Sequence, residues 1–151
     1  MKIFIEPIAS TADEAKRMLV ERAFGPGRAL AHHPDGAPYI VGSELHISIS
    51  HTRRECVLAV CDKPVGIDIE TARDQLVRVA GKFLAPGERP EMTPQGLLPY
   101  WTAKEAVYKC ARTPGLGLTE IEVNGDTATA RGRRYRLVRP RIGMTAAVEI
   151  E

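Results

Sequence analysis

Two short stretches of the chain carry side chains that could act together in a chemical site. The first alternates apolar residues with glycine or acids, which predicts a β-strand projecting Asp68 and Glu70 from one face. The second is typical of an amphipathic helix, with Glu105 and Lys109 one turn apart. Three carboxylates from a strand and a helix predict a site for a hard cation such as Mg²⁺. The stretches are Val65-Gly-Ile-Asp-Ile-Glu70 and Trp101-Thr-Ala-Lys-Glu-Ala-Val-Tyr-Lys109.

Each of these side chains also has a simpler interpretation. The two carboxylates of the strand could form a solvated strand end, and Glu105 with Lys109 could be an ion pair that supports the helix. His51 lies where a strand reaches a turn, beside Ser50 and Thr52. It could be a hydrogen-bonded structural histidine or a contact to a phosphate group. Taken singly, no residue decides between these alternatives.

Composition narrows the class of protein. The 151 residues are 44% hydrophobic and 26% charged, which is typical of a single globular domain. A net charge of +2 gives no indication of nucleic-acid binding. No apolar run approaches the ~20 residues that span a bilayer, and the N-terminus lacks the layout of a secretory signal. The three cysteines show no CxxC spacing, so buried thiols and a cytoplasmic location are expected.

Periodicity predicts an α+β fold with antiparallel sheets. Three closely spaced strands, separated by turns too short for a crossover, predict consecutive hairpins over residues 45–50, 56–61 and 65–70. Pro99 is expected to bend or split the last helix. Helices are predicted over residues 12–24, 74–84 and from Thr93 to about Ala111, and further strands over 1–7, 38–41, 119–123, 127–130, 135–138 and 145–150.

Read in order, the motifs resemble the 4′-phosphopantetheinyl transferases of the surfactin-synthetase-activating (Sfp) type. The resemblance runs over roughly residues 36–118, and the strand and helix motifs in tandem make it specific. The matching pieces are Gly36–Ile40, Ile49-Ser-His-Thr52, Val65–Glu70, Lys82–Glu88, Trp101–Lys109 and Gly115-Leu-Gly-Leu118.

The resemblance implies an activity and a fold. Such enzymes move 4′-phosphopantetheine from coenzyme A to a serine of an acyl or peptidyl carrier protein, with Mg²⁺, in fatty acid, polyketide or nonribosomal peptide synthesis. It also implies two pseudo-twofold-related α/β half-units with antiparallel sheets and one long helix each. The approximate halves are residues 1–64 and 65–151 of a single domain, with the site in the cleft between them.

Site residues follow from the same resemblance. The implied metal ligands are Asp68, Glu70 and Glu105. The implied catalytic residues are Glu105, as the base for the serine proton, and Lys109. The implied contacts to coenzyme A are Ser50, His51, Lys104 and Lys109.

Two other functions stay open. The short region before residue 36, and Ala37 where family members often have a basic residue, are compatible with a non-catalytic homologue that binds coenzyme A or a carrier protein. A Mg²⁺-dependent phosphohydrolase is a weaker alternative, because no second metal cluster is evident. The sequence leaves open whether the chain acts as a monomer or a dimer, and which carrier protein it serves.

Overall fold

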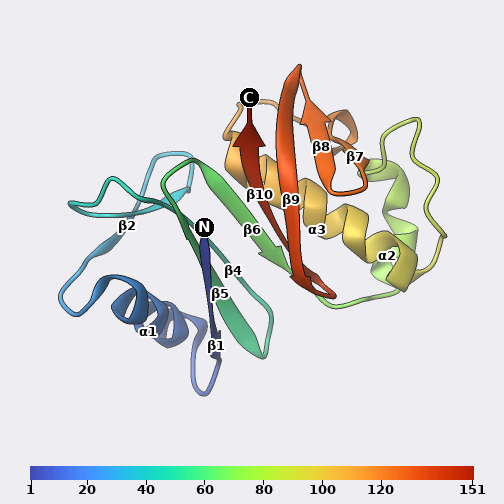
Figure 1. Cartoon of the computed structure of the whole chain (residues 1–151). Coiled ribbons are helices and arrows are strands. Elements are labelled where there is room, and N and C mark those ends of the chain that lie inside the picture. The colour runs from blue at the N-terminus through green and yellow to red at the C-terminus, as the bar shows by residue number, and fades with distance from the viewer.

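The structure, a computed structural model, describes residues 1–151 as two lobes that each place a helix against an antiparallel sheet (Figure 1). The N-terminal sheet has the strand order β1-β5-β4, and the C-terminal sheet has the order β6-β10-β9-β8-β7. The N-terminal lobe contains β1 (Lys2–Pro7), α1 (Ala12–Phe24), β4 (His46–His51) and β5 (Glu55–Cys61), with a small hairpin of β2 (Leu30–His32) and β3 (Pro38–Ile40). The C-terminal lobe contains β6 (Val65–Ile69), α2 (Gln75–Arg78), α3 (Pro94–Ala111), β7 (Glu122–Asn124), β8 (Thr127–Ala130), β9 (Arg133–Arg141) and β10 (Met144–Ile150).

The two lobes share one topology. In each, a first strand leads into a helix, and a later hairpin returns so that its second strand pairs antiparallel with the first. The order β1-β5-β4 is thus repeated as β6-β10-β9, extended by β8 and β7. The predicted α+β class with antiparallel sheets is confirmed. Only α3 is long, at 18 residues against 13 in α1.

Apolar side chains form three main layers. The helix α1 covers one face of the first sheet, where Leu19 and Leu58 are buried in the same apolar cluster. The helix α3 covers one face of the second sheet, where Val107 and Tyr135 are buried. The remaining faces of the two sheets pack against each other, so that Val57 and its β5 neighbours meet β6 and β10. Because β5 is buried on both faces, its sequence is a continuous apolar run.

Several predicted elements differ in the structure. The strands β5 and β6 do not pair, and the turn between them leads from one sheet to the other. The helix predicted over 74–84 is the single turn of α2 followed by a 3₁₀ turn, Ala80–Lys82. A second 3₁₀ turn, Leu118–Glu120, replaces the start of the strand predicted from 119. The split expected at Pro99 is wrong, because α3 runs without interruption from Pro94 to Ala111 with Pro99 inside it.

Strand β4 lies alongside β6 without belonging to its sheet. Two side chains replace the missing backbone ladder: the Ser48 hydroxyl accepts a hydrogen bond from the Ile67 amide at 3.0 Å, and the Ser50 hydroxyl accepts one from the Ile69 amide at 3.1 Å. We call this contact between β4 and β6 the seam. None of the helices is long and apolar enough to span a membrane.

The start of α3 is fixed by a cap: the Thr93 hydroxyl accepts a hydrogen bond from the Gly96 amide at 3.0 Å, and Pro94 follows at the first helical position.

Farther along, α3 packs closely on β6 because β6 contains a glycine, Gly66, at the contact. A methyl group added to Gly66 would lie 1.8 Å from the carbonyl oxygen of Ala106. Only glycine therefore lets α3 pack directly on β6.

We expect Gly66→Ala to lower the free energy of unfolding by about 3 kcal/mol or more, because α3 must move away from β6. Urea unfolding followed by circular dichroism measures this. Gly81→Ala is the matched control, because nothing lies within 4 Å of the added methyl group. Equal stability of the two variants would contradict the close packing of α3.

Candidate active site

Asp68 occupies the centre of the seam and is 8% exposed. The Ser50 hydroxyl donates to its Oδ1 at 3.2 Å while accepting from the Ile69 amide, so the single hydroxyl proton is committed to the carboxylate. The other oxygen, Oδ2, is buried and has no hydrogen-bond partner. An unpartnered buried carboxylate oxygen is costly, and it marks a position where a ligand would be stabilising.

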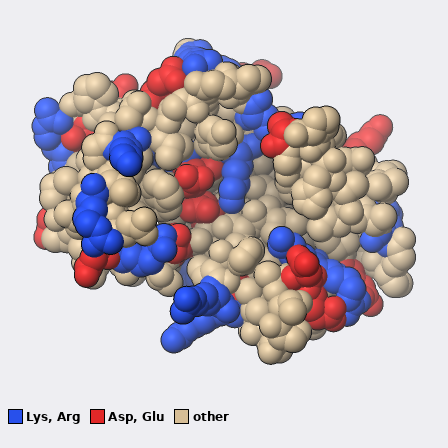
Figure 2. Space-filling model, turned by 180° about the vertical axis from the view of Figure 1, so that it is seen from behind, with Lys and Arg blue, Asp and Glu red and all other residues tan.

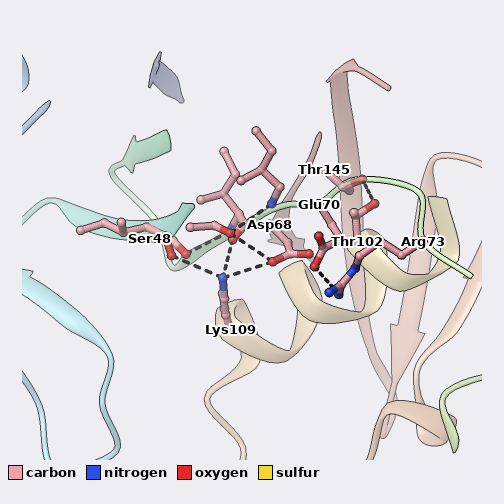
Figure 3. A network of polar contacts seen from close by, with 11 residues as sticks. Ser48, Asp68, Glu70, Arg73, Thr102, Lys109 and Thr145 are labelled. Carbon is pink, nitrogen blue, oxygen red and sulfur yellow. Dashed lines mark hydrogen bonds and ion pairs between the residues drawn. The ribbon is translucent and has the colours of Figure 1, made fainter. Parts of the chain in front are cut away.

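Lys109 extends from α3 across the seam (Figure 3). Its Nζ donates to the carbonyl of Ile67 at 2.9 Å, to the carbonyl of Ile49 at 3.3 Å and to Asp68 Oδ1 at 3.5 Å. One ammonium group therefore binds the helix, β4 and β6 together. Its side chain remains 31% exposed, so one side still faces the cleft.

Glu105 lies one helical turn before Lys109 and is half-buried. Burial raises the pKa of its carboxyl, with Lys109 opposing the rise and the charge of Glu70 adding to it. Burial likewise raises the pKa of Asp68 to about 6, with Lys109 lowering it and Glu105 raising it further. The carboxylates are near enough to repel one another, which a bound cation would relieve.

Glu70 follows the end of β6 and is already paired. Its Oε2 accepts from Arg73 at 3.0 Å (Figure 3). Its Oε1 accepts from the Thr71 amide at 3.0 Å. No group of three or more histidine, cysteine, aspartate or glutamate side chains is close enough to hold a metal ion in this arrangement.

The donor set nonetheless fits a magnesium ion held by fewer protein ligands. Mg²⁺ is commonly bound by one or two carboxylates, with waters and substrate phosphates completing its coordination. The buried Oδ2 of Asp68 and the mutually repelling carboxyls of Asp68 and Glu105 match that requirement. Glu70 could join them only if Arg73 released it.

The other predicted site residues fall in different places. Ser50 is buried in the seam and points to Asp68, so it positions the carboxylate. His51 is exposed at the end of β4, with Nδ1 lying 3.1 Å from the carbonyl oxygen of Thr52.

Lys104 is not in the cleft, and its predicted contact to coenzyme A is wrong. Its side chain is 0% exposed and lies on the core side of α3, where Nζ pairs with Glu88 at 2.8 Å. It also donates to the carbonyls of Leu118 and Ile121. Glu88 in turn accepts from the Ala85 and Val123 amides. Because Lys104 is adjacent in sequence to Glu105, the helical rotation of about 100° per residue places the two on different faces.

We expect Lys104→Met to destabilise the fold by about 3–5 kcal/mol, because it leaves Glu88 charged and unpaired in the core. Chemical denaturation measures the loss, with Lys63→Met as the control at an exposed lysine. A Lys104→Met variant as stable as the control would show that Glu88 does not depend on the pair.

A cavity of about 680 Å³ adjoins the seam at its other end. The end of α3, the N-terminal part of β4 and the β2–β3 hairpin line it, and it shares Lys109 and Ile49 with the carboxylate site. Figure 2 shows acidic and basic side chains side by side in the hollow between the lobes. No local sequence pattern indicates this cavity, because its walls come from segments far apart in the chain.

Sequence reasoning also missed Ser48, Gly66 and Arg73. The alternation Ile47-Ser-Ile-Ser50 is a signal for the seam, since two hydroxyls on one face of an apolar strand need partners. Arg73 lies three residues after Glu70, but no helix is present there to make that spacing informative.

We expect Asp68→Asn to change the pH dependence of stability in the metal-free protein. Because the folded-state pKa of about 6 lies above the ordinary value near 4, Asp68 lowers stability as the pH rises through this range. Relative to wild type, the variant should gain on the order of 2 kcal/mol in free energy of unfolding between pH 4 and pH 8. Urea titrations in EDTA at both pH values measure this, and a pH-independent difference would contradict it.

Two comparisons with known proteins match this region. A family model described as the 4′-phosphopantetheinyl transferase superfamily matches residues 64–142, which is more than half of the chain. A 4′-phosphopantetheinyl transferase of Bacillus subtilis is 35% identical over 92 residues, covering 56% of this chain and 40% of the relative. The matched segment thus covers less than half the length of that relative.

Proposed function

The chain belongs to the 4′-phosphopantetheinyl transferase superfamily, and we propose that it transfers 4′-phosphopantetheine from coenzyme A to a serine hydroxyl of an acyl or peptidyl carrier protein. The observation that carries the proposal is the buried, unpartnered Oδ2 of Asp68, which lies beside Lys109 and Glu105 at the junction of the lobes. Carboxylates and an ammonium group next to a large cavity suit a substrate that is both phosphorylated and bulky.

Asp68 and Glu105 would hold Mg²⁺, with Glu70 as a third ligand once Arg73 is displaced. The ion, when bound, supplies positive charge to the diphosphate oxygens of coenzyme A. The protein's own contribution is the orientation of Asp68. Ser50 and Lys109 both bind Oδ1, which leaves Oδ2 as the oxygen without a hydrogen-bond partner.

Lys109 and Glu105 have complementary tasks. The partly exposed Lys109 ammonium would contact a phosphate of the diphosphate from the cavity side, adding a positive charge to the leaving group. Glu105 would accept the proton of the attacking serine, directly or through a water molecule. Its raised pKa suits a general base better than an ordinary carboxylate does. The products are the modified carrier protein and adenosine 3′,5′-bisphosphate.

The proposed activity is of the holo-[acyl-carrier-protein] synthase type, carried out by a monomer or a dimer. A cytoplasmic location is also proposed. The three cysteines are buried free thiols, which suits a reducing compartment.

We expect Glu105→Gln and Asp68→Asn each to reduce transfer at least about a hundredfold, because they remove the base or a metal ligand. The assay incubates several purified acyl and peptidyl carrier proteins with coenzyme A and Mg²⁺, and mass spectrometry measures the gain of the pantetheine arm. Circular dichroism checks that the variants fold.

Arg134→Gln is the matched control, because Arg134 is exposed on β9 outside the cavity and makes no ion pair. Full activity in both site variants would refute the assignment of the site. Coenzyme A binding without turnover by the wild type would favour the non-catalytic homologue. Neither binding nor transfer would overturn the proposed function.

A further inference from the structure

The cavity beside Lys109 has a cationic lining. Three of its side chains are lysine or arginine, and Asp35 is the one acid among its lining residues. The cations are Lys109, Arg112 and Arg133. Such a lining favours an anionic ligand, but the cations differ in how many of their hydrogen-bond donors are already used.

Arg112 has the most free donors of the three. Lys109 donates to two carbonyls and Asp68. Arg133 binds Glu149 through two nitrogens, Nε at 2.8 Å and one terminal nitrogen. Arg112 donates only through Nε, to Asp35 at 2.9 Å, and its two terminal nitrogens have no partner. A guanidinium with a free fork of two nitrogens is suited to a phosphate.

The position of Arg112 is fixed from two sides. It caps the C-terminus of α3 in the left-handed conformation, with φ of 48°, which carries it out of the helix. Asp35, in the turn between β2 and β3, accepts from the Ala37 amide through one oxygen and from Arg112 Nε through the other. The guanidinium is thus oriented by the opposite wall of the cavity while 42% of the side chain remains exposed.

We propose that Arg112 binds a phosphomonoester on the ribose of the nucleotide, namely the 3′-phosphate of coenzyme A, through its two terminal nitrogens. The proposal rests on the function proposed above. Arg112 follows directly after α3, three residues beyond Lys109, so both cations lie at the C-terminal end of this helix. Because both side chains line the same cavity, a ligand with one anionic group at Lys109 and a second at Arg112 would contact both cations. Arg112 thereby makes the cavity selective for 3′-phosphorylated nucleotides.

The test measures binding without any carrier protein, so that it is independent of transfer. Isothermal titration calorimetry compares adenosine 3′,5′-bisphosphate with adenosine 5′-monophosphate on the wild type, Arg112→Gln and the control Arg134→Gln. We expect the wild type and the control to prefer the bisphosphate, and Arg112→Gln to weaken bisphosphate binding by about 10-fold to 100-fold. Binding of the monophosphate should change little.

A second measurement compares KM for coenzyme A with KM for 3′-dephospho-coenzyme A, where Arg112→Gln should remove most of the difference. Unchanged bisphosphate binding in Arg112→Gln, equal binding of both nucleotides by the wild type, or binding of neither would overturn the role of Arg112. Loss of transfer with nucleotide selectivity intact would overturn the transferase proposal and leave the role of Arg112 standing.

Discussion

The candidate site depends on the way two strands from different sheets meet. Strands β4 and β6 run side by side without a backbone ladder between them, so their polar groups need other partners. Ser48 and Ser50 supply two of these, and Lys109 supplies the third by donating to a carbonyl of each strand. The same side chains that join the lobes therefore define the surroundings of Asp68. The residues that stabilise the contact between the lobes are thus also residues of the candidate site.

The seam also explains why the negative charge of Asp68 is unfavourable in the free protein. Asp68 is held where burial disfavours its charge, and one ammonium and one hydroxyl do not compensate for both oxygens. A protein selected for stability alone would carry a neutral residue here. Retaining the carboxylate costs stability in the free protein, and under the proposed function it would provide affinity for a cation, which is a common compromise at functional sites.

The main residues of the candidate site were predictable from local sequence patterns, but most of the contacts around them were not. The alternation around Asp68 and the helical spacing of Glu105 and Lys109 gave the right elements, because both periods are local properties of the backbone. The pairing of β5 with β6 was wrong, because a short turn can connect two sheets as well as two paired strands. The prediction that Lys104 contacts coenzyme A was wrong, because a match to a motif does not show which face of a helix is buried. The contact between Arg112 and Asp35 joins residues far apart in sequence, and no local pattern indicates it.

The repeated topology suggests two independent halves, but the apolar layer between the sheets has a different consequence. If either lobe stood alone, the inner face of its sheet would be exposed to water, including Val57 and Ala59 on one side and Ile67 and Ala146 on the other. The unpaired groups of the seam would be exposed with them. The lobes therefore should fold as a single cooperative unit, so that the cleft between them is rigid and does not act as a hinge.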